Sequence, residues 1–262
     1  MPQSRLDAAG DVLSKVPQAT LIFWIVKICA TTVGETGGDA LSMSLNLGYL
    51  VSTAIFFVFL VVSVGVQVFA LRRFHPLSYW TVVVATTTVG TTMSDYLDRT
   101  VGLGYVTSSA ILFAGVIMVL LAWRLVTGHI AVDHIDDRRN EIFYWSAIVV
   151  SNTLGTALGD MTATTAGVGF EDGALLFAGL IAIVALLHFV PRAPQAILFW
   201  AAYVLTRPLG ATLGDTLTKP HDVGGLSLDR FAATGAIVLV MVAIVFMSSE
   251  ASPLRRPPQP AS

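Results

Sequence analysis

The stretch WIVKICATTVGETGGD, residues 24–39, recurs three more times along this chain of 262 residues. The other copies read WTVVVATTTVGTTMSD (80–95), WSAIVVSNTLGTALGD (145–160) and WAAYVLTRPLGATLGD (200–215). Every copy begins with a tryptophan, has a glycine ten residues later and ends on an aspartate, and another glycine follows nine residues after the aspartate. Such repetition predicts one fold assembled from four similar units.

The composition indicates a membrane protein. The chain is 55% hydrophobic and 12% charged, whereas an average soluble domain has about 25% charged residues. Apolar runs of bilayer-spanning length lie at 18–38, 46–71, 77–97, 103–126, 142–163, 171–190, 195–216 and 228–248. We therefore expect an all-α polytopic membrane protein with eight transmembrane helices. The first, third and seventh runs are the least apolar, which is typical of helices that face other helices.

The repeats also predict how the units are arranged. Each unit holds two spans, so every copy enters the membrane from the same side, and the four two-helix repeats are parallel around a pseudo-symmetry axis along the membrane normal. A four-fold ring and a two-fold pair of pairs both satisfy the sequence. We expect a first half at 1–128, a polar cytoplasmic linker at 129–141, a second half at 142–250 and a disordered tail at 251–262. Residues 1–18 lack an apolar stretch, so no cleaved signal peptide is expected.

Basic residues predict the orientation. Ten of them lie in the tails or after even-numbered spans, whereas only Arg99, Lys219 and Arg230 follow odd-numbered spans. The positive-inside rule then places both termini in the cytoplasm. The single cysteine, Cys29, excludes an internal disulfide. Nothing in the sequence suggests nucleic acid as a partner.

A polar row is expected along one face of each odd-numbered span. Residues 3, 7, 11 and 15 positions after the tryptophan share a helix face. The rows are Lys27, Thr31, Glu35, Asp39; Val83, Thr87, Thr91, Asp95; Ile148, Asn152, Thr156, Asp160; and Tyr203, Arg207, Ala211, Asp215. If the rows converge, Thr31, Thr87, Thr91, Asn152 and Thr156 line a substrate path. The Gly-x-x-x-Gly pattern, which is Gly-x-x-x-Ser in the second unit (Gly90 to Ser94), favours close helix packing.

The acidic residues predict a cation site. An ionisable residue in an apolar span is costly, which favours a functional role. The predicted metal ligands are Glu35, Asp39, Asp95, Asp160 and Asp215. Their oxygens suit hard divalent cations, with Mn²⁺ favoured over Mg²⁺ and Ca²⁺. Four neighbouring carboxylates cannot all stay ionised without a cation, so protons should exchange for metal. The alternative is that each aspartate caps its own helix locally.

Two cations lie inside the predicted spans. Lys27 and Arg207 occur in one copy each, and an unpaired charge at that depth costs several kcal/mol or more. Each therefore needs an acidic partner, either as a counter-ion that substrate displaces or as part of a permanent ion pair. Pro208 is expected to kink its span. A polar rim, formed by Asp98, Arg99, Lys219, His221 and Asp222, is either an entrance or an ordinary loop.

The fourfold G-x-x-x-[GS]-D unit between paired spans resembles a family of bacterial integral membrane proteins described by a tandem repeat of unknown function. The resemblance covers about residues 20–248 and implies a fold of four units and eight spans, with no activity attached. In addition, Glu35-Thr-Gly-Gly-Asp39 is similar to the acidic motifs of cation exporters that move calcium or manganese, although the spacing differs by one residue and the other copies lack the glutamate.

We therefore expect a non-enzymatic secondary transporter that exports a hard divalent cation in exchange for protons. Its partners would be the metal cation, protons and the lipid bilayer, with a possible homodimer and no permanently bound cofactor. One alternative is a carrier of organic cations that uses Trp24, Trp80, Trp145 and Trp200 as aromatic surfaces. Another is a non-transporting membrane scaffold or assembly protein, in which the glycine motifs serve only helix packing.

Overall fold

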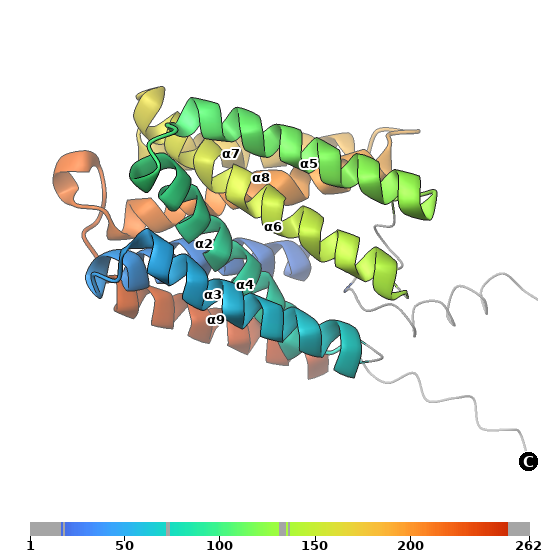
Figure 1. Ribbon diagram of the computed structural model, residues 1–262. Helices are drawn as coiled ribbons and strands as arrows, with labels where there is room; N and C mark the ends of the chain where they lie inside the picture. Colours follow the sequence, from blue (N-terminus) through green and yellow to red (C-terminus); the bar gives the residue numbers. More distant parts are fainter. Residues whose placement is uncertain (1–16, 18, 72–73, 131–134, 136, 251–262) are drawn as a thin grey trace, which may run out of the picture.

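The computed structural model describes residues 17, 19–71, 74–130, 135 and 137–250, and over these residues every regular element is helical. The predicted tail at 251–262, most of the N-terminal segment and part of the linker lie outside the described residues. The long helices are α2 (Leu21–Asp39), α3 (Gly48–Gly65), α4 (Pro76–Asp95), α5 (Tyr105–Thr127), α6 (Arg138–Asp160), α7 (Phe170–Leu187), α8 (Gln195–Thr218) and α9 (Arg230–Glu250). They lie side by side as one bundle (Figure 1).

Helices α2, α4, α6 and α8, the first helix of each repeat, form a closed inner ring. Each packs against the next, and α8 returns to α2. The second helices cover this ring from outside: α3 packs on α4, α5 on α6, α7 on α8 and α9 on α2. Each outer helix therefore lies against the inner helix of the following repeat, and the fourth repeat closes on the first.

The repeated glycines explain why the inner helices approach so closely. A Cβ atom added to a glycine of one inner helix would collide with the residue seven positions after the tryptophan of the next helix. The nearest contacts are Gly34 with Thr87 (2.3 Å), Gly90 with Asn152 (3.0 Å), Gly155 with Arg207 (2.5 Å) and Gly210 with Thr31 (2.2 Å). Small residues allow such backbone approach, so the glycine motif serves helix packing around the whole ring.

The glycine that follows each aspartate has a different role. Gly48, Gly104 and Gly169 have φ values of 74°, 74° and 86° at the starts of α3, α5 and α7. Residues with a side chain rarely adopt this left-handed region. The chain reverses here after a π-helical turn that extends the inner helix beyond its aspartate, namely η1 (Ala40–Ser44), η3 (Tyr96–Thr100) or η4 (Met161–Thr165). A further π turn, η2 (Val66–Ala70), ends the helix of α3.

Six of the described helical segments are long and apolar enough to cross a membrane. They comprise the four outer helices together with α6 and α8; α2 and α4, the first and third predicted spans, fall short of that apolarity. The outer segments have 11–22% of their most apolar window buried, against 67% for α6 and 56% for α8. The outer helices therefore present the apolar surface suited to lipid, and the less apolar inner helices are shielded by them.

The last residues of the predicted linker are helical. The linker was expected to extend to residue 141, but α6 begins at Arg138. Asp137 caps this helix, because its carboxylate accepts hydrogen bonds from the backbone N–H groups of Arg139 and Asn140. An aspartate at the N-cap stabilises the first helical turn. This turn is polar, so apolar patterning does not assign it to a membrane span.

Candidate functional site

The acidic side chains of all four repeats meet at one end of the inner ring. Asp39, Asp95, Asp160 and Asp215 occupy the C-terminal parts of their helices, and Glu35 lies one turn before Asp39. All five, which we call the acid cluster, are at most 3% exposed. One oxygen each from Glu35, Asp39 and Asp215 lies within 4.8 Å of the others. This spacing allows three carboxylates to share one cation.

Local capping does not account for the aspartates. Asp39, Asp95 and Asp160 have right-handed helical backbone angles, and none of them makes a side-chain capping bond to the turn that follows. The helix continues past each of these residues instead of ending there. The carboxylates instead form ion pairs: Asp95 and Asp215 with the basic residue four positions later, and Asp39 and Asp160 with a basic residue of another repeat. This differs from the alternative in which each aspartate caps its own helix.

Two basic residues bridge the acid cluster between repeats. The Lys219 Nζ atom lies 2.9 Å from Asp39 and 3.0 Å from Asp215. The Arg99 guanidinium lies 2.9 Å from Asp95 and 3.7 Å from Asp160. These rim residues are thus ion-pair partners of the acids. These ion pairs were not predicted from the sequence. A sequence feature that indicates them is the basic residue four positions after the aspartate, which only the second and fourth repeats have.

The two bridges give the site a two-fold pattern within the four-fold helix ring. We call Glu35, Asp39, Asp215 and Lys219 the lysine lobe, and Asp95, Asp160 and Arg99 the arginine lobe. In the arginine lobe, the guanidinium also donates hydrogen bonds to the hydroxyls of Tyr49 and Tyr105. The lysine lobe has the extra carboxylate, Glu35. The lobes therefore differ in their negative charge and in how firmly their cation is held.

Arg207 crosses the centre of the ring. Its guanidinium lies 3.0 Å from the Glu35 carboxylate on α2 and donates a short hydrogen bond to the Thr91 hydroxyl on α4. Helix α4 is not a ring neighbour of α8, so the side chain spans the axis to reach it. Arg207 is fully buried. The predicted acidic partner is therefore Glu35, and the pair closes the axis beneath the acid cluster.

Lys27 departs from its prediction. It is fully buried, but within the described part of the chain it forms no ion pair, and its Nζ atom has no hydrogen-bond partner. Instead, this atom lies 4.1 Å from the centre of the Tyr203 ring. The expectation of an acidic partner was wrong because Glu35 lies two turns farther along α2 and is already paired with Arg207.

The predicted path residues lie inside the ring but are mostly engaged between helices. The Thr31 hydroxyl donates to the Thr206 carbonyl on α8, and the Thr87 hydroxyl donates to the Ala30 carbonyl on α2. The Asn152 amide donates to the Thr86 hydroxyl. Thr91 binds both the Gly34 carbonyl and Glu35, and Thr156 donates to the carbonyl of Asn152. All five side chains are at most 1% exposed, so the predicted substrate path is closed to solvent in this conformation.

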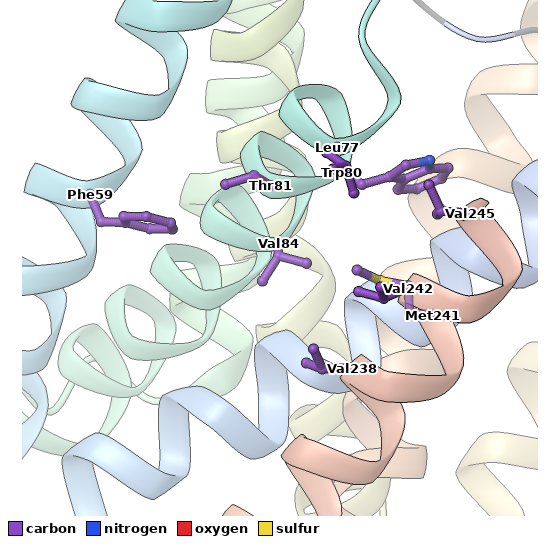
Figure 2. A pocket seen from close by; sticks show the side chains of 9 residues that line it. All are labelled: Phe59, Leu77, Trp80, Thr81, Val84, Val238, Met241, Val242 and Val245. Carbon is purple, nitrogen blue, oxygen red and sulfur yellow. The ribbon is translucent and has the colours of Figure 1, made fainter. Parts of the chain in front are cut away.

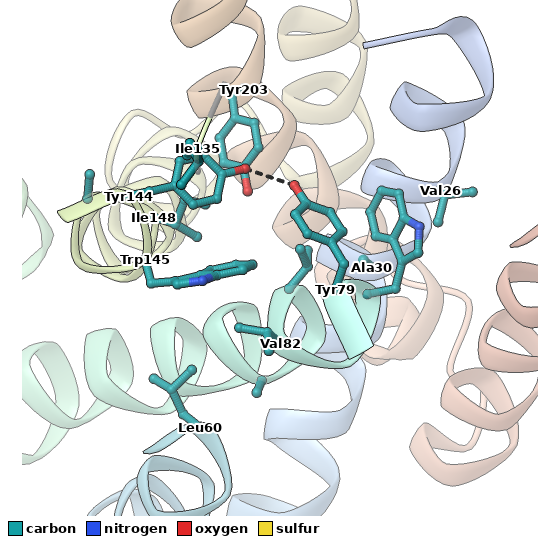
Figure 3. Packing of buried hydrophobic residues seen from close by; sticks show 14 of the residues in the cluster. Val26, Ala30, Leu60, Tyr79, Val82, Ile135, Tyr144, Trp145, Ile148 and Tyr203 are labelled. Carbon is teal, nitrogen blue, oxygen red and sulfur yellow. Dashed lines mark hydrogen bonds between the residues drawn. The ribbon is translucent and has the colours of Figure 1, made fainter. Parts of the chain in front are cut away.

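Aromatic side chains fill the opposite end of the ring. The hydroxyls of Tyr79 on α4 and Tyr144 on α6 lie 2.8 Å apart, with Tyr203 and Trp145 beside them (Figure 3). Trp145 and Trp200 each pack against Tyr144, and Trp24 packs against Phe199. Each tryptophan lies 15 residues before the aspartate of its repeat, so these contacts close the end of the ring opposite to the acid cluster.

An apolar groove lies outside the ring, between α3, α4 and α9. Its walls include Phe59, Trp80, Val84, Met241 and Val245 (Figure 2). Its lining contains no charged side chain. The groove is therefore separate in chemistry and position from the acid cluster.

The charges in the acid cluster nearly balance. The five carboxylates meet four basic side chains in the described part of the chain: Arg99, Arg207, Lys219 and Arg230, whose Nε lies 3.8 Å from Asp39. One negative charge remains if every group is ionised. Burial lowers the pKa of Lys219, but the carboxylates of Asp215 and Asp39 more than offset this, so its pKa lies well above the usual value. Lys219 is therefore charged at neutral pH.

The four repeats are also found by comparison with known families. Residues 22–73, 78–129, 143–193 and 198–251 each match the family described as Repeat of Unknown Function (DUF347). These matches cover most of the chain and confirm the predicted resemblance to a tandem repeat of unknown function. No curated protein and no solved structure matches the chain.

Proposed function

We propose that this chain, which belongs to the family described as Repeat of Unknown Function (DUF347), transports a hard divalent cation across a membrane in exchange for protons. In this proposal all eight helices cross the bilayer, with the four repeats parallel around an axis along the membrane normal. Both termini lie in the cytoplasm, and the acid cluster faces the outside of a bacterial inner membrane. Manganese is the favoured substrate, and export is the favoured direction.

The observation that carries the proposal is the convergence of buried carboxylates in the lysine lobe. Burying one charged group in a bilayer costs several kcal/mol, yet Glu35, Asp39 and Asp215 approach one another within 4.8 Å. Oxygen donors in such a group suit Mn²⁺, Mg²⁺ or Ca²⁺. Like carboxylates at this separation also bind protons in competition with metal. Cation and proton therefore compete for the same oxygens, which is the chemical requirement for exchange.

The closed state of the ring supports alternating access. Arg207 and Glu35 close the axis just below the acid cluster, and the aromatic side chains close the far end. A cation at the acid cluster reaches the other side only if Arg207 leaves Glu35. Arg207 then acts as the tethered counter-ion of the predicted mechanism, and Pro208 next to it lies inside α8, where it removes one backbone hydrogen bond.

The alternatives receive less support from the geometry. An organic-cation carrier needs aromatic surfaces next to its negative charges, but the tryptophans lie at the end of the ring opposite to the acid cluster. A pure scaffold, in which the glycine motifs serve only helix packing, agrees with the contacts of these glycines between neighbouring helices. It gives no reason, however, for the buried carboxylates of Glu35, Asp39 and Asp215 to converge.

Flux measurements in proteoliposomes test the proposal. Asp39→Asn and Glu35→Gln are expected to lower Mn²⁺ flux at least about tenfold, because a lost first ligand should cost no less than a lost supporting contact. Asp160→Asn is expected to have a smaller effect, since it belongs to the arginine lobe. The matched control is Asp172→Asn, because Asp172 is an exposed acid at the start of α7.

An imposed pH gradient tests the coupling in the same vesicles. A proton gradient directed opposite to the Mn²⁺ gradient should accelerate Mn²⁺ flux through the wild-type protein. This acceleration should be absent in Glu35→Gln and Asp39→Asn. Flux of Mn²⁺, Mg²⁺ and Ca²⁺ that is unaffected by the acid substitutions, or no flux above empty vesicles, would contradict transport by this site.

A further inference from the structure

The loop after α8 places Lys219 in the acid cluster. Lys219 follows directly after α8, and its side chain turns back so that Nζ lies between Asp39 of the first repeat and Asp215 of the fourth. Its side chain is only 10% exposed. A positive charge thus already occupies the place between two of the three carboxylates that come within 4.8 Å of one another.

The loop that carries Lys219 is folded against the end of α8. Backbone N–H groups of Leu226, Ser227 and Leu228 donate to the carbonyls of Thr216, Lys219 and Leu217 at 2.7–2.9 Å. The fourth repeat has Gly225 where the other repeats have an aromatic residue after the repeated glycine. A Cβ atom on Gly225 would lie 1.9 Å from the Lys219 carbonyl oxygen. Only a glycine allows this loop to close over the lysine.

Lys219 differs from Arg99, its counterpart in the arginine lobe. Arg99 is bound by two tyrosine hydroxyls in addition to Asp95 and Asp160. Lys219 has one compact ammonium group between two carboxylates, and that group fits the space a small cation would take. Its loop lies outside the long helices and is held by backbone hydrogen bonds and by contacts of His221 with Ser227 and Gly225. The lysine lobe is therefore the one from which a cation can displace its occupant.

We propose that Lys219 is a built-in competitor for the transported cation: its ammonium fills the site when no metal is present and leaves with its loop when metal binds. This inference rests on the proposed function and assigns the substrate to the lysine lobe. The charge balance supports a divalent ion. If all five carboxylates are ionised, the described cluster as a whole carries one net negative charge with Lys219 in place and two when it leaves, so a divalent cation restores the neutrality of the cluster.

Direct binding of Mn²⁺ to the purified full chain in nanodiscs tests the inference without transport. A competitor that occupies most of the sites lowers the apparent affinity by the fraction of sites left open, so Lys219→Gln is expected to tighten Mn²⁺ binding about tenfold. Gly225→Ala keeps the lysine but disturbs its loop, and it should tighten binding in the same direction. Arg99→Gln, the matched removal of a charge in the arginine lobe, should tighten binding clearly less than Lys219→Gln does.

The outcomes separate the inference from the proposed function. Titration calorimetry gives the affinities, and thermal unfolding shows that each variant is folded; Gly225→Ala provides the test if Lys219→Gln fails to fold. If the wild-type protein binds Mn²⁺ and neither Lys219→Gln nor Gly225→Ala binds it more tightly, the proposed role of Lys219 is wrong and the proposed cation site is retained. Equal tightening in Arg99→Gln would show a general charge effect and also overturn it. Absence of Mn²⁺ binding in wild type and all variants overturns the cation site itself.

Discussion

Replacing Arg207 with methionine is expected to lower the free energy of unfolding by about 3–5 kcal/mol, because it leaves a buried charge without its partner. Arg207 is fully buried, and Glu35 is 3% exposed beside it. The guanidinium also donates to Thr91 and to the Thr31 carbonyl, so the substitution removes contacts with two inner helices at once. Thermal unfolding in detergent, followed by helical circular dichroism, measures the loss.

The double variant Arg207→Met with Glu35→Gln separates the charge effect from loss of packing. Removing both charges of a buried pair costs much less than removing one, so the double variant should recover most of the stability lost in Arg207→Met. Arg207→Lys is expected to recover only part of it, because an ammonium lacks the planar fork that reaches two helices. An Arg207→Met protein as stable as wild type would show that the ion pair of Arg207 and Glu35 does not stabilise the inner ring.

Adding a single methyl group at Gly210 is expected to destabilise the bundle by about 1–3 kcal/mol or more, the usual cost of overpacking. The new Cβ atom would lie 2.2 Å from the Thr31 hydroxyl oxygen and 2.8 Å from a backbone atom of the same residue. Moving the side chain of Thr31 therefore does not relieve the collision. Helices α8 and α2 must separate, and this is the contact that closes the ring between the last repeat and the first.

The matched control for Gly210→Ala is Gly179→Ala on α7. Nothing lies within 4 Å of a Cβ atom at Gly179, and alanine is favoured over glycine in a helix by about 1 kcal/mol. This control should be neutral or stabilising in the same unfolding measurement. Gly34→Ala, at the equivalent contact between α2 and α4, should behave like Gly210→Ala. Equal stability of Gly210→Ala and Gly179→Ala would contradict the close approach of the inner helices.

Much of the fold could be predicted from the repeated unit. The spacing of tryptophan, glycine and aspartate indicates four two-helix units, and the structure has eight long helices in the described part of the chain. The low apolarity of the first and third predicted spans indicates helices shielded from lipid, and α2 and α4 are indeed in the inner ring. Helix α6 begins four residues before the predicted span, because capping by Asp137 is a local polar effect that apolar patterning does not detect.

The site was only partly predictable. The repeat predicts that the four aspartates occur at one depth. The structure brings Asp39 and Asp215 together with Glu35, and Arg99 joins Asp95 to Asp160. Pairing was harder to predict, because Arg207 and Lys27 both seemed to need an acid and only the packing of α2 against α8 shows which cation reaches Glu35. Tyr203, an aromatic residue at the row position of Lys27, takes the place of the acid expected for that lysine.

The sequence by itself determined the repeat, the helical class, the glycine-lined inner faces and the shared depth of the aspartates, because these depend on spacing along a single helix. Tertiary structure decided that the inner helices close into a ring, that Arg207 spans its axis and that Lys219 and Arg99 bridge neighbouring repeats. Ion pairing depends on distances between side chains that are far apart in the chain. Lys219 and Asp39, for example, are 180 residues apart and 2.9 Å distant, a proximity that only the closing of the fourth repeat on the first creates.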